Sequence, residues 1–281
     1  MQILILIIFF IPNSFQYSFK FGDTRLILDP HCGRSSSSRF FNNSQKIING
    51  DRVPLGAYPW LINIYTETDL SLTRFCSGTL ISDMYVLTAA HCVRDRILSQ
   101  LKIGYGHTNY EKMYINNWSR KVSDIILNDQ NKDIALLRLE SGIDLSDRSK
   151  VSTICLPPNV DTRVVFGKEV VVAGWGSTNG KKSDPTKTAD LFETTLTIDT
   201  RCSLFNDFYC LIDLKNDGRE SNSCYGDSGT PAMYYDNMMS RWYAYGVLSL
   251  ASVRNSICQP NEPSFHVKVP EFLRWIRDSV Y

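Results

Sequence analysis

Several features that mark other classes of protein are missing from the 281-residue chain. Its 30 basic and 29 acidic residues leave a net charge of +1, so no overall electric field recruits nucleic acid or an anionic membrane. No C-x-x-C pair occurs, which argues against a structural zinc site, and no H-E-x-x-H occurs, which argues against a zinc-dependent hydrolase. We therefore expect no metal and no cofactor, and partners have to be inferred from a local site.

Long hydrophobic runs are also missing, apart from one at the N-terminus. Residues 1–11 are almost all apolar and are followed by Pro12. This run is shorter than the roughly 20 residues of a membrane-spanning helix and is typical of a secretory signal peptide. No Lys or Arg precedes it and no A-x-A-like cleavage site follows it, so we place a signal peptide at 1–18, with its end between Ser14 and Ser18. The sequence thus predicts a secreted, extracellular protein with no membrane anchor.

Cysteine, in contrast, is plentiful. An even number of cysteines behind a signal peptide predicts disulfides, although the count leaves their pairing open. Two N-x-S sequons predict N-glycosylation at Asn42 and Asn117, as suits a secreted protein. The eight cysteines stand at positions 32, 76, 92, 155, 202, 210, 224 and 258.

Residues 19–46 are polar and rich in turn-forming residues, so we interpret them as a pro-segment without a core of its own. The segment ends at Lys46, directly before the apolar start at Ile47. Cleavage after Lys46 would create a new α-amino group on Ile47. The alternative is that the first strand simply begins here.

Beyond Gly50 the pattern is β throughout, because short runs rich in Val, Ile, Tyr and Thr alternate with turn residues. Closely spaced strands without intervening helices favour antiparallel barrels or sandwiches. Pro157 to Thr162 interrupts the strands and divides the domain 47–281 into lobes of about 47–158 and 159–281. A helix with one apolar stripe is expected after Pro270. The expected strands are 60–65, 79–82, 85–88, 121–127, 134–139, 170–173, 193–198, 242–250 and 264–269.

One serine, Ser228, stands on a glycine-rich turn in the stretch 223–231. The flanking glycines let a substrate carbonyl approach the N–H groups of Gly226 and Ser228, as a nucleophile loop requires. A plain Asp-Ser-Gly surface turn has the same composition. A serine hydroxyl is a weak nucleophile, so the catalytic interpretation requires a base and an orienting acid elsewhere.

The candidate base is His91, which follows an apolar strand and is tethered by the neighbouring Cys92. His31 and His107 lie in polar surroundings that indicate the surface, and His266 lies within a strand. The candidate acid is Asp133, which heads an otherwise apolar strand, where a buried carboxylate is costly unless it has a partner.

Four segments resemble those of the chymotrypsin-like (trypsin-fold) serine endopeptidases, and the order His91, Asp133, Ser228 is also that of the family. The resemblance runs from Ile47 to Tyr281 and implies an all-β fold of two antiparallel six-stranded β-barrels with a C-terminal helix. The four segments are Leu87-Thr88-Ala89-Ala90-His91-Cys92, Asp133-Ile134-Ala135-Leu136-Leu137, Gly174-Trp175-Gly176 and Gly226-Asp227-Ser228-Gly229.

The resemblance implies a role for each candidate residue. Ser228 attacks the scissile carbonyl, His91 transfers its proton, and Asp133 fixes the imidazole tautomer, with Ser249 supporting the acid. The N–H groups of Gly226 and Ser228 form the oxyanion hole. The freed amino group of Ile47 would pair with Asp227, which makes the chain a zymogen. The implied partners are protein or peptide substrates, an activating trypsin-like protease and protein inhibitors.

The resemblance also implies a neutral specificity pocket. Asn222 stands where enzymes that cleave after Arg or Lys carry Asp, and Ala251 and Ser264 stand where glycines usually form the walls. We therefore expect a preference for small or medium uncharged residues before the scissile bond. Thr230 replaces a second glycine beside the nucleophile, so the alternative is a catalytically silent homologue that acts as a binding or regulatory module. The implied disulfides are Cys32–Cys155, Cys76–Cys92, Cys202–Cys210 and Cys224–Cys258.

Overall fold

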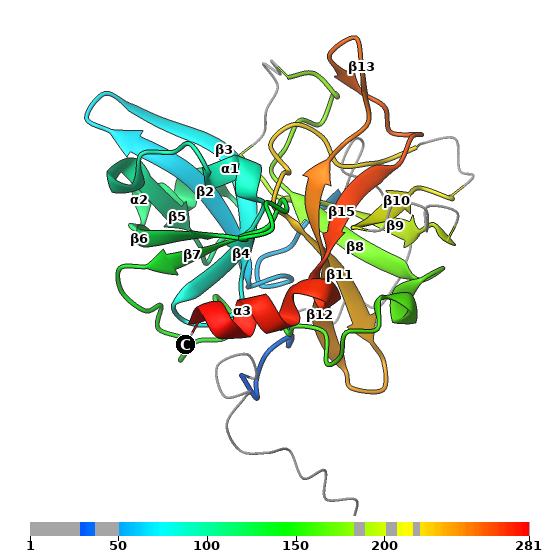
Figure 1. Cartoon of the computed structure of the whole chain (residues 1–281). Helices are drawn as coiled ribbons and strands as arrows, with labels where there is room; N and C mark the ends of the chain where they lie inside the picture. The colour runs from blue at the N-terminus through cyan, green and yellow to red at the C-terminus, as the bar shows by residue number, and fades with distance from the viewer. Residues whose placement is uncertain (1–28, 37–50, 183–188, 201–206, 216–219, 281) are drawn as a thin grey trace, which may run out of the picture.

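The computed structural model describes residues 29–36, 51–182, 189–200, 207–215 and 220–280. Their strands form two barrels that lie side by side, and a C-terminal helix runs beneath them in the view of Figure 1. Within these residues, no helix has the length and apolar content that crossing a membrane requires. The predicted signal peptide, the end of the pro-segment with Lys46 and Ile47, and Asn42 all lie outside the described residues.

The first barrel is a closed antiparallel ring in the order β2-β3-β4-β7-β6-β5. Neighbours along the chain mostly pair with each other, and β5 returns to β2 to close the ring. Its strands are β2 (Leu61–Thr68), β3 (Ser71–Leu80), β4 (Tyr85–Thr88), β5 (Leu101–Gly104), β6 (Ser119–Leu127) and β7 (Ala135–Leu139).

The second barrel follows the order β9-β10-β15-β12-β11-β8, and pairing of β8 with β9 closes it. The short strand β1 adds to the outside of β9. The predicted fold of two six-stranded antiparallel barrels is therefore confirmed. The strands of this sheet are β1 (Asp51–Arg52), β8 (Glu169–Gly174), β9 (Phe192–Ile198), β10 (Phe208–Ile212), β11 (Pro231–Asp236), β12 (Arg241–Leu250) and β15 (Ser264–Lys268).

Helices are few and short among the described residues, and a small hairpin projects from the second barrel (Figure 1). The predicted C-terminal helix is confirmed, because Ile276 and Val280 on its apolar stripe are buried in the core. The remaining elements are α1 (Ala90–Val93), α2 (Tyr110–Ile115), α3 (Leu273–Val280), the 3-10 helices η1 (Leu98–Gln100), η2 (Thr162–Val165) and η4 (Val269–Phe272), and the hairpin β13 (Val253–Arg254) with β14 (Ile257–Cys258).

Every strand expected from the sequence overlaps an observed one, but the barrel strands β5, β10 and β11 and the two-residue strands β1, β13 and β14 were not predicted. Strand β11 begins at Pro231, which indicates a turn in the sequence but is tolerated as the first residue of a strand. Strand β3 is also longer than predicted: its first half, residues 71–75, is exposed or half-buried and mixes polar with apolar residues, so it shows no regular apolar alternation. That half of β3 lies close to the candidate site.

Three disulfides link the described residues, and they are three of the four pairs expected: Cys32–Cys155, Cys76–Cys92 and Cys224–Cys258. The expected partner of Cys210, Cys202, lies outside the described residues. The first pair holds part of the predicted pro-segment on the protease domain. Asp29 strengthens this attachment by pairing with Arg148 (2.6 Å) and accepting a hydrogen bond from the Thr153 hydroxyl (2.8 Å).

Candidate active site

His91 and Asp133 meet at one edge of the first barrel. Strands β4 and β7 are antiparallel neighbours, and Thr88 at the end of β4 pairs with Ala135 at the start of β7. His91 follows β4 on helix α1, and Asp133 precedes β7 by two residues. The register of two buried strands therefore places the candidate base beside the candidate acid.

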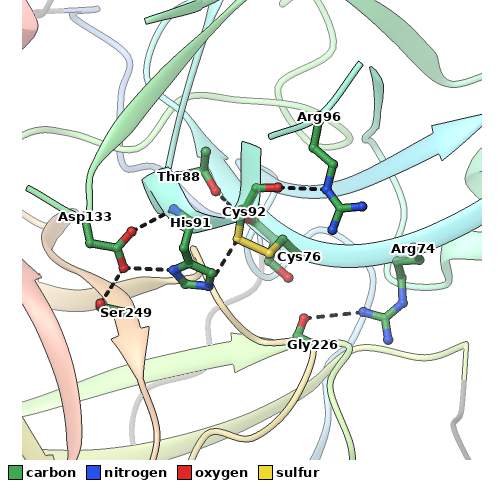
Figure 2. The surroundings of a disulfide bond; sticks show 10 residues. Arg74, Cys76, Thr88, His91, Cys92, Arg96, Asp133, Gly226 and Ser249 are labelled. Carbon is green, nitrogen blue, oxygen red and sulfur yellow. Dashed lines mark hydrogen bonds and ion pairs between the residues drawn. A yellow bond between two sulfur atoms is a disulfide. The ribbon is translucent and has the colours of Figure 1, made fainter. Parts of the chain in front are cut away.

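The acid holds the histidine at two points (Figure 2). His91 Nδ1 lies 2.8 Å from Asp133 Oδ2, and the His91 backbone N–H donates to Oδ1 at 2.8 Å. The Ser249 hydroxyl from β12 donates to the same Oδ2. Both barrels thus contribute to fixing the orientation of one imidazole ring.

The pKa of Asp133 is set by two opposing effects. Burial on its own would raise the pKa, but hydrogen bonds from His91 and Ser249, together with the charge of His91, hold it below its ordinary value. Asp133 therefore stays ionised, as a group that orients an imidazole and stabilises its protonated form must.

Ser228 sits on a tight loop that both barrels hold. The Ser77 N–H of β3 donates to the Ser228 carbonyl oxygen (2.8 Å), and the Gly229 N–H donates to the Leu248 carbonyl oxygen of β12 (2.9 Å). Gly229 has a φ of +84°, and a Cβ there would lie 2.2 Å from the Ser77 oxygen. Only glycine fits this position, so the loop requires the residue that the motif supplies.

No hydrogen bond links the Ser228 hydroxyl to His91 in the described part of the chain. The His91 Nε2 atom instead faces Cys92 Sγ at 3.7 Å (Figure 2). Hydrogen bonds between nucleophile and base are commonly long in proteases without substrate and tighten when one binds. The acid–base pair is thus assembled, whereas the nucleophile is near it but not joined to it.

Asp227, directly before the nucleophile, is completely buried. Its carboxylate accepts hydrogen bonds from the N–H groups of Gly176 (2.8 Å) and Cys224 (2.9 Å). A Cβ on Gly176 would lie 2.4 Å from this carboxylate, which explains a glycine in the Gly174-Trp175-Gly176 segment. Burial raises the pKa of Asp227 to about 6, although these two hydrogen bonds and the charge of Arg74 act in the opposite direction. Asp227 makes no ion pair with any described residue.

The three predicted pocket residues lie on segments that are bonded to one another. The Asn222 amide donates to the Glu262 carbonyl oxygen (2.7 Å), two residues before Ser264. The Ser252 hydroxyl, next to Ala251, donates to the Pro263 carbonyl oxygen (2.6 Å). Asn222 Oδ1 accepts from the N–H of the following residue, so the Asn222 side chain is fully used by the backbone.

His266, which the sequence places within a strand, lies two residues after Ser264 on β15. His266 is completely buried, and its Nε2 atom lies 3.2 Å from the Ser264 hydroxyl. Burial lowers the pKa of His266 to about 3, so the ring is neutral at physiological pH. The three predicted pocket residues, Asn222, Ala251 and Ser264, carry no charge.

Thr230 is buried and hydrogen-bonded through both its side chain and its backbone. Its side chain is buried and its hydroxyl donates to the Ala173 carbonyl oxygen of β8. Its backbone N–H donates to the Asp227 carbonyl oxygen (3.0 Å). The hydroxyl gives the loop an extra attachment that glycine would lack.

Two residues close to the site were not predicted from the sequence, Ser77 and Arg74. Both lie on β3, close to the disulfide Cys76–Cys92. The only available signal was their proximity to Cys76 in the sequence, because a polar strand segment carries no periodic pattern. Ser77 holds the backbone of Ser228, and the Arg74 guanidinium lies 3.4 Å from the Gly226 carbonyl oxygen.

Comparison with known proteins agrees with this arrangement. The family model described as Trypsin matches residues 47–276. The chain is 30% identical to the CLIP domain-containing serine protease HP8 of Bombyx mori, over 83% of this chain and 69% of that protein. It is 28% identical to Melanization protease 1 of Drosophila melanogaster, over 96% of this chain and 72% of that protein. Transmembrane protease serine 5 of Homo sapiens is 28% identical over 84% of this chain, which spans 52% of that protein. The chain therefore belongs to the trypsin family of serine proteases and is a serine-type endopeptidase.

Proposed function

We propose that the chain hydrolyses peptide bonds through Ser228, His91 and Asp133. The observation that supports this most strongly is the two-point bond between His91 and Asp133, beside a serine on a glycine-rich loop. Ser228 Oγ attacks the scissile carbonyl while His91 Nε2 accepts its proton. His91 then protonates the leaving amine, and water hydrolyses the acyl-enzyme by the same steps.

The oxyanion of the tetrahedral intermediate would bind the N–H groups of Gly226 and Ser228. Each such donor contributes about 3–4 kcal/mol to transition-state stabilisation in serine hydrolases. Gly226 has a φ of +94°, a backbone conformation that favours glycine. Asp227 lies between the two donors in the sequence, so its position would govern this part of the site.

Activation would follow cleavage after Lys46, when the new ammonium group of Ile47 pairs with Asp227. The support is the buried state of Asp227, whose carboxylate makes no ion pair with any described residue and whose pKa burial raises to about 6. A buried carboxylate gains strongly from such a partner. The pair would fix the Gly226 peptide and complete the oxyanion hole.

The pocket formed by Asn222, Ala251 and Ser264 favours small or medium uncharged residues before the scissile bond. Without an acidic floor, the chain would not cleave after its own Lys46, so a separate trypsin-like protease is the expected activator. Secretion, protein inhibitors and glycosylation at Asn117 belong to the same proposal. Asn117 is exposed in the turn after α2, where a glycan can be added.

Labelling with a fluorophosphonate tests this function. The chain is cleaved after Lys46 with trypsin, separated from it, and incubated with the probe. We expect labelling of Ser228 in the cleaved protein, little labelling of the uncleaved protein, and none after Ser228→Ala. Cleavage of a diverse peptide mixture then reports the residue preferred before the scissile bond.

The absence of a bond between Ser228 and His91 makes the silent homologue a real second candidate. Cleaved protein that is folded, shows an intact Ile47 N-terminus and still does not label would favour a binding module. Dominant cleavage after Arg or Lys would leave the catalytic proposal intact but overturn the proposed specificity.

A further inference from the structure

Strand β3 forms a wall on one side of the nucleophile, from Ser77 through Arg74 to Leu72. Ser77 bonds to the Ser228 backbone, and the disulfide Cys76–Cys92 joins β3 to the helix that carries His91. In Figure 2, Asp133 and Ser249 lie on one side of His91, while Arg74 lies beyond the disulfide on the other. This second side has no role in the proposed catalytic steps.

The geometry assigns this wall to the part of the substrate that follows the scissile bond, an inference that rests on the proposed function. The residue before the bond would occupy the pocket of Asn222, Ala251 and Ser264 in the second barrel. The chain beyond the bond must then leave in the other direction. Since Ser228 is bonded to Ser77, the departing segment passes along β3.

Arg74 is a charged group on this wall, next to the oxyanion loop. Its Nη1 atom lies 3.4 Å from the Gly226 carbonyl oxygen, and its guanidinium lies 5.2 Å from the centre of the Tyr110 ring. Tyr110 in turn lies 5.8 Å from Tyr114 on α2. The aromatic platform and the Gly226 carbonyl hold the guanidinium in place without neutralising it.

The charge of Arg74 has no direct anionic partner among the described residues. Burial lowers the pKa of Arg74, while the charge of Asp227 acts in the opposite direction. The Asp227 carboxylate is bonded to the N–H groups of Gly176 and Cys224 and not to Arg74. A partly buried cation in this condition gains from a carboxylate supplied from outside.

Farther from the nucleophile along β3, exposed apolar side chains take the place of the charged one. Residues two apart on a strand point to the same face, so Leu72 follows Arg74 about 7 Å away. Leu72 is 40% exposed, and Leu70 at the tip of the hairpin is 97% exposed. The wall thus presents a cation near the oxyanion loop and apolar side chains beyond it.

We propose that Arg74 and Leu72 form a subsite that selects substrates with an acidic residue within the first three positions after the scissile bond, followed by an apolar one. Arg74 binds the carboxylate, and the apolar side chain packs on Leu72. The alternative is that Arg74 serves only as a distant counter-charge for Asp227.

Matched peptides separate these two roles. Each series keeps the residues before the bond constant and places Asp, Asn or Lys at the first, second or third position after it. For the cleaved enzyme we expect at least one position where Asp raises kcat/KM about tenfold over Asn, a preference that weakens at high salt because the pair is partly exposed. Arg74→Gln should bring the Asp/Asn ratio close to one, and Arg74→Lys should retain part of it.

Arg94→Gln is the matched control, because Arg94 is exposed and bonds to Asn131 away from this wall. It should leave the ratio unchanged. An Asp/Asn ratio of one at all three positions in the unmutated enzyme overturns the proposal, whatever the variants do. An equal loss on all peptides after Arg74→Gln also overturns it and favours the role as counter-charge for Asp227.

Failure of the proposed function itself would be distinguishable. In that case no peptide is cleaved and fluorophosphonate does not label Ser228. Labelling of every variant confirms that the comparison is made between folded, catalytically competent proteins.

Discussion

On one side of His91, the acid, its serine support and the Nδ1 atom form a closed set of hydrogen bonds, while on the other side the Ser228 hydroxyl has no bond to the imidazole. The first side depends on paired buried strands that form as soon as the barrels fold. The second side depends on a loop whose acid, Asp227, is buried without an ionic partner in the described structure. Folding alone thus places His91 against Asp133, whereas in the proposed function the nucleophile loop is completed only by cleavage after Lys46.

The largest expected effect on activity comes from disrupting the interaction between Asp133 and His91. Asp133→Asn keeps the shape of the side chain but cannot hold the imidazole in the productive tautomer. We expect kcat/KM of the cleaved enzyme to fall by about 10⁴-fold, the size of this effect in the chymotrypsin family. Peptide hydrolysis is the measurement, with Asp144→Asn on the exposed surface as the control. A loss below tenfold would show that Asp133 does not orient His91.

The nucleophile side of the site can be tested by measuring how the contribution of Asp227 to the free energy of unfolding depends on pH. In the uncleaved chain the pKa of Asp227 is about 6, against an ordinary value of 3.8, so the native state binds its proton more tightly than the unfolded state. Between pH 4 and 6 the native chain retains this proton while the unfolded chain loses it. The contribution of Asp227 to the free energy of unfolding therefore decreases as pH rises, by on the order of 2–3 kcal/mol.

Denaturant unfolding of the unmutated chain and of Asp227→Asn at pH 4 and pH 7 measures this contribution. We expect the difference between the two proteins to change between these pH values in the uncleaved form. After cleavage the dependence should shrink, because the Ile47 ammonium compensates the carboxylate. A difference that is the same at both pH values in the uncleaved chain contradicts the assignment. Protonation of His266, whose folded pKa is about 3, destabilises both proteins equally as pH falls and cancels in the comparison.

The smallest expected effect concerns the attachment of the loop to β8. Thr230→Val preserves the shape and removes the hydroxyl that donates to the Ala173 carbonyl oxygen. We expect a loss of about 1 kcal/mol of stability and little change in kcat/KM of the cleaved enzyme. Thermal unfolding and peptide hydrolysis report the two quantities. A large loss of activity with unchanged stability would instead indicate that Thr230 acts on Ser228.

Much of the fold, and the pairing of His91 with Asp133, could be predicted because buried strands joined by short turns leave a clear apolar pattern in the sequence. The apolar residues Val86 and Leu87 precede His91, and the apolar run Ile134 to Leu137 follows Asp133. The register of β4 and β7 brings these two polar residues into contact. The nucleophile loop was found for a related reason, since its glycines meet a steric need that no other residue satisfies.

The wall formed by β3 could not be predicted in the same way. Arg74 and Ser77 act through positions in space that arise only when β3 passes the loop of residues 226–229 from the other barrel. Whether the Ser228 hydroxyl bonds to His91 is also outside what residue types can decide, because side-chain rotation alone changes it. Sequence patterns report burial and backbone requirements, whereas these features depend on packing between the two barrels.

The disulfide Cys32–Cys155 would keep both products of the proposed activation cleavage in one molecule. A cut after Lys46 would divide the polypeptide in two, yet the fragment that contains Asp29 and Cys32 would remain attached by this covalent bond. Nothing of that fragment diffuses away, so mass and hydrodynamic size would stay almost constant. The switch from precursor to enzyme would then be a change in the connectivity of one particle, visible in its N-termini and after reduction but not in its size.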